Sequence, residues 1–326
     1  MSEIRKDPFS EAFVIYSPER ENRPNFTGVR KYIELTPENC PFCAGNEDMT
    51  PPEIFRIGDN ASGWKTRVIP NKFPVLGVEE KYREMNEGFF KMFKSAGAHE
   101  IVIETPIHSE DILRCGPEYY RNIFVTYRER IKDLKRDSRL KYVQIFKNYK
   151  ASAGATISHN HSQLIALPFI PAEVKRKLII LKDFYEKDNR SLFSEIISAE
   201  LEHRKRIVSE NDKFIAVNPW YSRNSFQIAF YQKKGCFRFE DISDMNLEEL
   251  SKIFDTVMRK LVNALGDLPF NLLLHNAPFE EDDHPYFNWY LEILPALEGT
   301  GGFESATGVF INSVLPEKAA EILGHF

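Results

Sequence analysis

The chain has 326 residues, 43 of them Lys or Arg and 48 Asp or Glu, which gives a net charge of -5 and a pI near 6.0. That length suits about two domains of roughly 100 to 200 residues each, and 42% hydrophobic residues suffice for buried cores. The acidic balance argues against a protein that coats nucleic acid. Neither a signal segment nor an apolar run of roughly 18 residues stands in the sequence. We therefore expect a cytoplasmic protein with no nucleic-acid or membrane partner.

The first half of the chain predicts several strands and one helix. Strands are expected at 66–74 and 99–104, then a helix through 120–134, a strand at 142–146 and a strand that ends at Pro168. Apolar side chains recur along one face of the helix, at Tyr120, Phe124, Tyr127, Ile131 and Leu134. This helix should cover one face of an antiparallel sheet.

The second half repeats this order after a charged, helical stretch. Strands are expected at 214–219, 226–230, 271–275 and 290–295. The intervening helix has its apolar stripe at Leu247, Leu250, Phe254, Val257 and Leu261. The repetition predicts an α+β fold of two duplicated units, with antiparallel sheets and helices packed on one face. The expected divisions are a first unit at 1–170, a helical connector at 171–210 and a second unit at 211–326.

Three polar side chains alternate within His159-Asn160-His161-Ser162-Gln163. On a strand this spacing places His159, His161 and Gln163 on one face. An imidazole can attack phosphorus, while a neutral amide donates to a phosphoryl oxygen without losing a proton. A bare His-x-His is more often a pair on a solvated face. Asn148 and the small residues 151–156 upstream favour a phosphate site, because they allow the backbone to approach a ligand closely. The motif therefore indicates nucleotidyl transfer.

Cys40-Pro-Phe-Cys43 has the spacing of half a metal site. A tetrahedral zinc needs two more ligands, and His108 and His159 are the candidates. A metal held by these four residues would fix the strand that presents His161, so it would be structural. The alternative is a tight turn with two free thiols.

The second half lacks the histidines of this motif. Asn288-Trp289-Tyr290 stands where the first half has His161-Ser162-Gln163, and neither Asn nor Tyr can replace an imidazole nucleophile. We expect one chemical site per chain, with the second unit supplying binding surface. His99, on a strand of alternating character, is more often a hydrogen-bonded sheet residue than a site residue, so it receives no role.

Dispersed motifs in a fixed order connect the chain to a known family. They are Ser17–Pro24, Cys40–Cys43 with Asn46-Glu47, Arg67–Asn71, Glu104–His108, Asn148, Gly154–Gln163, His275–Phe279 and Gly302–Glu304. In them the chain resembles the galactose-1-phosphate uridylyltransferase family, a branch of the histidine-triad superfamily that also includes ADP-glucose phosphorylase-like enzymes. The resemblance implies a ping-pong reaction in which His161 attacks the α-phosphorus of a nucleoside diphosphate sugar and forms a nucleotidyl-histidine.

The resemblance also implies roles for other residues. Gln163 and Thr156 would hold phosphoryl oxygens, and Arg20 and Arg23 would lie near the substrate phosphates. The remaining substrate-binding positions would be Asn71, Asn148, Gly154, Phe303 and Glu304. The family's zinc ligands carry over onto Cys40, Cys43, His108 and His159. The family commonly forms a dimer, in which Phe303 and Glu304 would reach the neighbour's site.

Some positions depart from the family pattern. A second metal in some members needs a glutamate and histidines where this chain has Lys177, Tyr290 and Glu292, so no second metal is expected. Lys72 and Lys150 also replace an aspartate and a glycine of some relatives, which bears on base and sugar specificity. The leading hypothesis is a UDP-glucose:hexose-1-phosphate uridylyltransferase. The alternatives are an ADP-glucose or dinucleoside polyphosphate phosphorylase or adenylyltransferase and, from another class, a non-catalytic nucleotide-binding protein.

Overall fold

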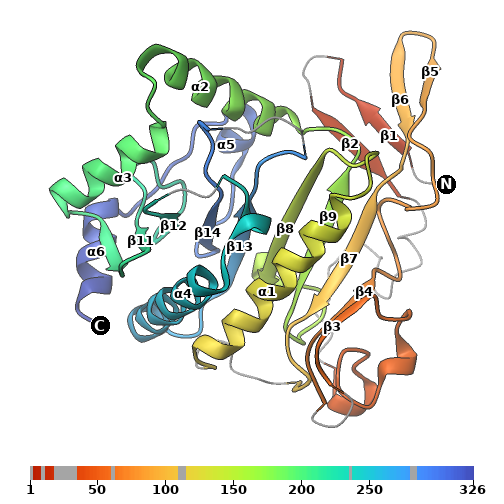
Figure 1. The fold of residues 1–326 in the computed structure, drawn as a ribbon, viewed down its shortest axis with the longest axis horizontal. Helices are drawn as coiled ribbons and strands as arrows, with labels where there is room; N and C mark the ends of the chain where they lie inside the picture. The colour runs from red at the N-terminus through yellow and green to blue at the C-terminus, as the bar shows by residue number, and fades with distance from the viewer. Residues whose placement is uncertain are drawn as a thin grey trace.

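The centre of the protein is one antiparallel sheet that runs through both halves of the chain (Figure 1). The computed structural model describes residues 3–8, 12–17, 35–59, 63–108, 115–234, 237–279 and 285–326. Within these ranges the sheet has ten strands, in the order β10-β11-β12-β14-β13-β8-β9-β7-β4-β3. Their bounds are β3 Phe55–Asp59, β4 Gly63–Pro70, β7 Ala98–Ile103, β8 Tyr142–Tyr149, β9 His161–Leu167, β10 Ile207–Glu210, β11 Phe214–Val217, β12 Ile228–Gln232, β13 Phe270–His275 and β14 Tyr290–Pro295.

The two halves of this sheet have the same strand order. From the β8–β13 junction outward, the first half runs β8, β9, β7, β4, β3 and the second half runs β13, β14, β12, β11, β10. If the five strands of each half are numbered along the chain, both halves have the order fourth, fifth, third, second, first. Strands β8 and β13 pair antiparallel, with Asn148 opposite Asn271. The α+β class and the antiparallel pairing are confirmed, whereas the division into units at 170 and 210 stays a prediction.

The helices cover the sheet in two layers. Helices α1 (Pro117–Leu134) and α4 (Asp244–Leu265) lie side by side on one face, with the Tyr120 and Phe254 rings 4.8 Å apart. Both predicted apolar stripes are buried there, and each such side chain contributes about 1.5–3 kcal/mol through burial. Helices α2 (Ala172–Asp188) and α3 (Leu192–His203) pack on the other face of the second half, through Leu181, Phe193 and Ile197. In the described ranges, no helix is both long enough and apolar enough to cross a membrane.

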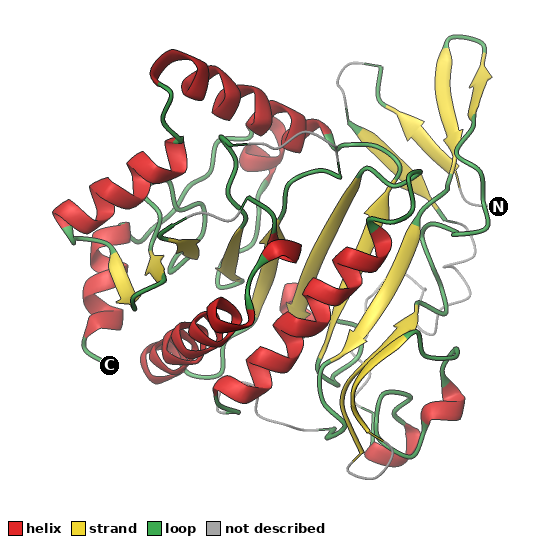
Figure 2. Cartoon of the chain, in the orientation of Figure 1, coloured by secondary structure: helices red, strands yellow, loops and turns green. Residues whose placement is uncertain are grey.

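Four shorter strands form a separate antiparallel sheet beside the first half, at the side of the molecule away from α3 and α6 (Figure 2). The strands are β1 (Glu3–Lys6), β2 (Phe13–Tyr16), β5 (Glu84–Glu87) and β6 (Phe90–Lys94). The C-terminal part adds α5 (Gly302–Thr307) and α6 (Pro316–Gly324), and α6 packs against α4.

Alternation along β9 decides which side chains face the candidate site. Ser162 points toward α1, because the Tyr127 hydroxyl donates to its Oγ at 2.7 Å. His161 and Gln163 therefore lie on the opposite face, which no α-helix in the described part of the first half covers. The expectation that His159 shares this strand was wrong. The strand begins at His161, and His159 precedes it in a bend.

Candidate functional site

A tight knuckle holds the two cysteines of the predicted metal site. The Cys43 amide donates to the Cys40 carbonyl at 3.2 Å, and Gly45 takes a positive φ of 92° that favours glycine. The Asn46 side chain donates to the Cys40 carbonyl at 2.8 Å. A further hydrogen bond, from the Ala44 amide to the Pro106 carbonyl at 3.2 Å, joins the knuckle to the segment that carries His108.

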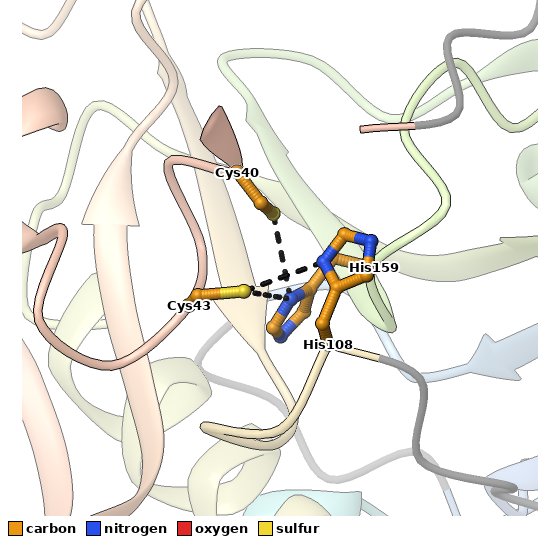
Figure 3. Close-up of side chains that lie close together, drawn as sticks. All are labelled: Cys40, Cys43, His108 and His159. Atoms are coloured by element: carbon orange, nitrogen blue, oxygen red, sulfur yellow. Dashed lines mark hydrogen bonds between the residues drawn. The ribbon is translucent and has the colours of Figure 1, made fainter. Parts of the chain in front are cut away.

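Cys40, Cys43, His108 and His159 converge from three segments of the chain (Figure 3). Cys43 Sγ lies 3.3 Å from His108 Nδ1 and 3.6 Å from His159 Nδ1, and Cys40 Sγ lies 3.5 Å from His159 Nδ1. A tetrahedral ion with bonds of about 2.3 Å to sulfur and 2.0–2.1 Å to nitrogen spaces these atoms about 3.5 Å apart. The four side chains therefore fit a metal ion, and the free-thiol alternative does not explain the two histidines.

The hydrogen bonds of His159 prepare it as a ligand. Its Nε2–H donates to the Thr105 carbonyl at 2.7 Å, which places the lone pair on Nδ1, toward the cysteines. Burial lowers the pKa of His159 to about 4, so the imidazole is neutral. Burial, together with the neighbouring Cys40, raises the pKa of Cys43 to about 12. A metal must therefore displace a thiol proton as it binds.

His161 begins β9 next to this cluster and is 7% exposed. Its Nδ1 lies 2.8 Å from the His159 carbonyl oxygen, and a carbonyl can only accept, so Nδ1 carries the hydrogen. The lone pair of the neutral ring is then on Nε2. Phe42 of the knuckle packs against the ring, with centroids 5.4 Å apart. The His159 carbonyl therefore sets the tautomer of His161, and Phe42 of the knuckle helps to hold its ring in position.

Gln163 lies on the same face of β9, opposite Ile101 of β7. Its Oε1 is 3.1 Å from Nε2 of His99, which is 4% exposed. The Asn71 amide also lies beside this ring, with Nδ2 3.1 Å from His99 Nε2. Sequence reasoning gave His99 no role, and its alternating strand pattern carries no signal of this contact.

A second pair of amides shapes the small-residue loop before the histidines. Asn271 Nδ2 donates to Asn148 Oδ1 at 2.7 Å and to the Ala153 carbonyl at 2.8 Å. Asn148 Nδ2 in turn approaches the Gly154 carbonyl at 3.4 Å. Asn271 belongs to β13 of the second half, and sequence reasoning missed it. The partly buried Thr156 follows on this loop.

Two profiles of protein families match the chain. The profile described as "Galactose-1-phosphate uridyl transferase, N-terminal domain" covers residues 1–171, and one described as a domain of unknown function (DUF4921) covers residues 114–324. The ADP-glucose phosphorylase of Arabidopsis thaliana is 34% identical over 98% of this chain and 92% of its own length. The chain belongs to the galactose-1-phosphate uridylyltransferase family.

Other members of the uridylyltransferase family agree with this assignment. The galactose-1-phosphate uridylyltransferase of Thermotoga maritima is 26% identical over 99% of this chain and 98% of its own length. A crystal structure of the Arabidopsis thaliana ADP-glucose phosphorylase with bound ADP-glucose has a TM-score of 0.78 and 32% identity, covering 100% of this chain and 99% of that one. The chain is therefore an enzyme of nucleotidyl transfer, as the sequence predicted.

The other positions that the sequence marked make different contacts or lie outside the described residues. Arg20 and Arg23 lie outside the described residues. Phe303 is 51% exposed on the short helix α5, where the Glu304 carboxylate accepts from the Gly301 amide at 3.1 Å. Lys72 is exposed. Lys150 has a positive φ of 69°, and its ammonium contacts the Asp267 carboxylate at 2.5 Å. The charge of Lys150 is therefore already engaged by an acidic partner.

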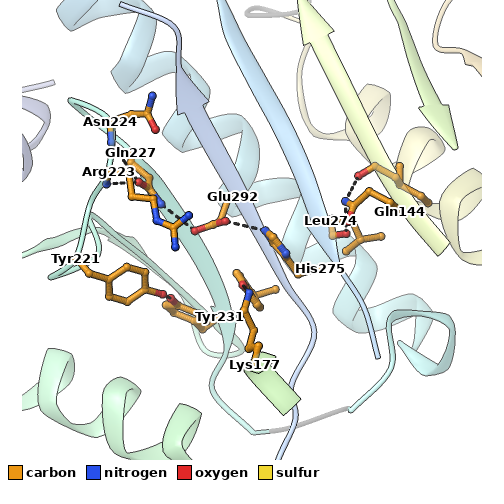
Figure 4. Close-up of polar contacts among 12 residues, drawn as sticks. Gln144, Lys177, Tyr221, Arg223, Asn224, Gln227, Tyr231, Leu274, His275 and Glu292 are labelled. Carbon is orange, nitrogen blue, oxygen red and sulfur yellow. Dashed lines mark hydrogen bonds and ion pairs between the residues drawn. The ribbon is translucent and has the colours of Figure 1, made fainter. Parts of the chain in front are cut away.

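The second half has a largely buried polar cluster at the positions that the sequence analysis considered for a second metal (Figure 4). His275 Nε2 and Glu292 Oε2 are 2.7 Å apart, and Gln227 Nε2 donates to Glu292 Oε1 at 2.8 Å. The Lys177 ammonium donates to the Tyr290 hydroxyl, and the Tyr290 ring stacks on His275. Lys177, Tyr290 and Glu292, which the sequence analysis considered together, thus lie close together in space around His275. The expected absence of a second metal stays a prediction.

Proposed function

We propose that this enzyme transfers a nucleotidyl group through a covalent intermediate on His161. The observation that carries the proposal is the hydrogen bond from His161 Nδ1 to the His159 carbonyl at 2.8 Å. It puts the lone pair on Nε2, the atom that attacks phosphorus in the neutral ring. His161 is only 7% exposed, so the two histidines are not simply a pair on a solvated surface.

The reaction proceeds in two displacements. Nε2 of His161 attacks the α-phosphorus of a nucleoside diphosphate sugar, a P–N bond forms, and the bond to the bridging oxygen breaks to release sugar 1-phosphate. An oxygen of the acceptor then attacks the same phosphorus and the P–N bond breaks. Gln163, Thr156, Asn148 and the backbone near Gly154 hold the phosphoryl oxygens, and Asn71 takes part in binding the nucleotide.

The proposed donor is ADP-glucose, with inorganic phosphate as acceptor and ADP with glucose 1-phosphate as products. This choice follows the 34% identity to the Arabidopsis thaliana ADP-glucose phosphorylase, compared with 26% to the Thermotoga maritima uridylyltransferase. The second candidate is transfer from UDP-glucose to a hexose 1-phosphate, which the match of the uridyl transferase profile to residues 1–171 favours.

The proposed metal is zinc, bound by Cys40, Cys43, His108 and His159. Two thiolates and two imidazoles suit zinc, and four protein ligands leave no open position for a substrate. Zinc would therefore hold the knuckle and the segment before β9, and the chemistry remains with His161.

We also include in the proposal a homodimer in the cytoplasm. Apolar side chains from α5 to the start of α6 are exposed, and solvent-facing apolar segments of this kind mark interfaces. They are Phe303, Val309, Phe310, Ile311 and Leu315. In a dimer this segment would allow Phe303 and Glu304 to act at the neighbour's site.

The test compares turnover of two substrate pairs. The purified protein is given ADP-glucose with phosphate, and separately UDP-glucose with galactose 1-phosphate, and kcat/KM is measured from product formation by chromatography. A higher kcat/KM for the first pair supports phosphorolysis of ADP-glucose. A higher value for the second moves the assignment to uridylyl transfer, and turnover of neither pair overturns the proposed function in favour of a binding protein.

A further inference from the structure

The amide of Gln163 can face the substrate with either its oxygen or its amino group. Only the amino group donates to a phosphoryl oxygen, whereas the oxygen repels it. The two orientations have nearly the same shape, so packing alone does not choose between them. A hydrogen-bond partner with a fixed role must set the orientation, and His99 is the neighbour that contacts Gln163 Oε1, at 3.1 Å.

The backbone decides which nitrogen of His99 carries the hydrogen. The Val75 amide donates to His99 Nδ1 at 3.2 Å, so Nδ1 is an acceptor. A neutral imidazole with an accepting Nδ1 has its hydrogen on Nε2. His99 is 4% exposed, and it sits diagonally across the β7–β9 pair from Gln163 on the same face of the sheet. The His99 Nε2–H can therefore donate a hydrogen bond to Gln163 Oε1.

The Asn71 amide is oriented in the same place. The Phe73 amide donates to Asn71 Oδ1 at 2.9 Å, which turns the Asn71 amino group toward the His99 ring. Asn71 Nδ2 and His99 Nε2 are 3.1 Å apart. Because both nitrogens then carry hydrogens, neither accepts from the other, and the Asn71 amino group keeps its capacity to donate to a ligand.

We infer that His99 is a positioning residue that holds Gln163 with its amino group toward the phosphoryl group attacked by His161. This inference rests on the proposed function and deepens it. The chain of contacts runs from the Val75 amide, through the two nitrogens of His99, to Gln163 Oε1. A backbone donor in the segment after β4 thus fixes the direction of the Gln163 amide on β9.

Two substitutions of His99 separate this role from a structural one. His99→Gln carries a donor out to about the position of Nε2, and so keeps a donor for Gln163. His99→Asn is shorter; it keeps an acceptor near Nδ1 for the Val75 amide and cannot reach Gln163. We measure the rate of nucleotidyl-His161 formation by rapid quench and mass spectrometry, and the KM for the nucleotide sugar. Thermal unfolding and metal content serve as controls for the fold.

The inference predicts that His99→Asn slows adduct formation roughly 10-fold, the worth of one hydrogen bond that acts in the transition state. In His99→Asn the KM should change less than the rate of adduct formation. His99→Gln should keep most of the wild-type rate. In a Gln163→Ala background, His99→Asn should cause no further loss, because the residue through which it acts is gone. A near-normal rate in His99→Asn, or an equal loss in both backgrounds, would overturn the inference.

A second measurement does not depend on turnover. Long-range 1H–15N correlation spectra of the 15N-histidine-labelled protein report the tautomer of each ring. Nε2–H with a bare Nδ1 is expected for His99, assigned by its loss in His99→Gln. An Nδ1–H tautomer would overturn the inference even in a protein that forms no adduct, so failure of this inference and failure of the proposed function can be told apart.

Discussion

His161 donates its Nδ1 hydrogen to the backbone carbonyl of His159, 2.8 Å away, and His159 directs its own Nδ1 at the two cysteines. The proposed metal ligand and the proposed nucleophile are therefore joined by one hydrogen bond. A residue that holds the metal also sets which nitrogen of His161 can attack phosphorus. The proposed metal site and the reaction should accordingly fail together, although the metal is assigned no part in the chemistry.

Cys43→Ser tests this coupling. Loss of one of four ligands should release the metal, lower the free energy of unfolding by several kcal/mol, and reduce adduct formation at His161 because the segment before β9 loses its anchor. Metal content is measured by inductively coupled plasma mass spectrometry. Cys115→Ser is the matched control, since Cys115 lies outside the cluster. A Cys43→Ser protein that reacts at the normal rate without metal would contradict the coupling.

Asn271→Ala tests the contribution of the second half to the site. Its amide joins Asn148 to the loop at Ala153, and without it Asn148 loses the donor that orients its side chain. We expect kcat/KM to fall roughly 10-fold, because about two hydrogen bonds are removed at the small-residue loop 151–156. Steady-state kinetics measure this. Asn263→Ala, on the exposed side of α4, should leave kcat/KM unchanged. Equal values for the two variants would remove Asn271 from the account.

Lys150 occupies a backbone conformation that glycine tolerates far better, with φ 69° and ψ 163°. Such strain costs about 1–3 kcal/mol, and the partly exposed pair with Asp267 returns little of it. Lys150→Gly should therefore be about 1–2 kcal/mol more stable than Lys150→Ala, which loses the same ion pair and keeps the Cβ. Urea unfolding of both variants measures the difference. An alanine variant as stable as the glycine variant would mean that the backbone there is unstrained.

The largely buried His275–Glu292 pair predicts that the stability of the protein decreases as the pH decreases. Burial lowers the pKa of His275 in the folded protein. Below about pH 6.5 the unfolded chain therefore binds a proton that the folded protein does not, and the folded state loses stability. Burial alone would raise the pKa of Glu292. The hydrogen bond and charge of His275, together with Lys177 and Gln227, outweigh burial, so the net pKa of Glu292 is lowered. The stability that Glu292 contributes is present above about pH 4.3 and is lost as the pH falls further.

Urea unfolding between pH 7.5 and 4, in steps of about half a unit, measures this dependence. His275→Gln keeps a donor for Glu292 and cannot titrate, so its curve should be flatter than that of the wild type between about pH 6.5 and 5. If the two curves run parallel there, His275 is not the group responsible.

Sequence patterns predicted what is local and left out what is not. Alternating and 3.6-residue periods located α1, α4 and eight of the ten strands of the large sheet, because their apolar side chains pack in the core. The two edge strands, β3 and β10, were not predicted. Cysteine spacing and the two histidines predicted the metal cluster. The pairing of β8 with β13 brings Asn271 to Asn148 from a distant part of the chain, and no spacing encodes that. His99 was passed over because its role depends on a backbone amide, that of Val75.

The most direct test of the account is intact mass spectrometry of the protein mixed with ADP-glucose or UDP-glucose and no acceptor. The account predicts a covalent nucleotidyl adduct in the wild type, adenylyl in preference to uridylyl, that inorganic phosphate discharges and His161→Ala abolishes. Peptide mapping should place the adduct on His161. An adduct that survives in His161→Ala, or none from either nucleotide sugar while both bind, would contradict covalent transfer through His161.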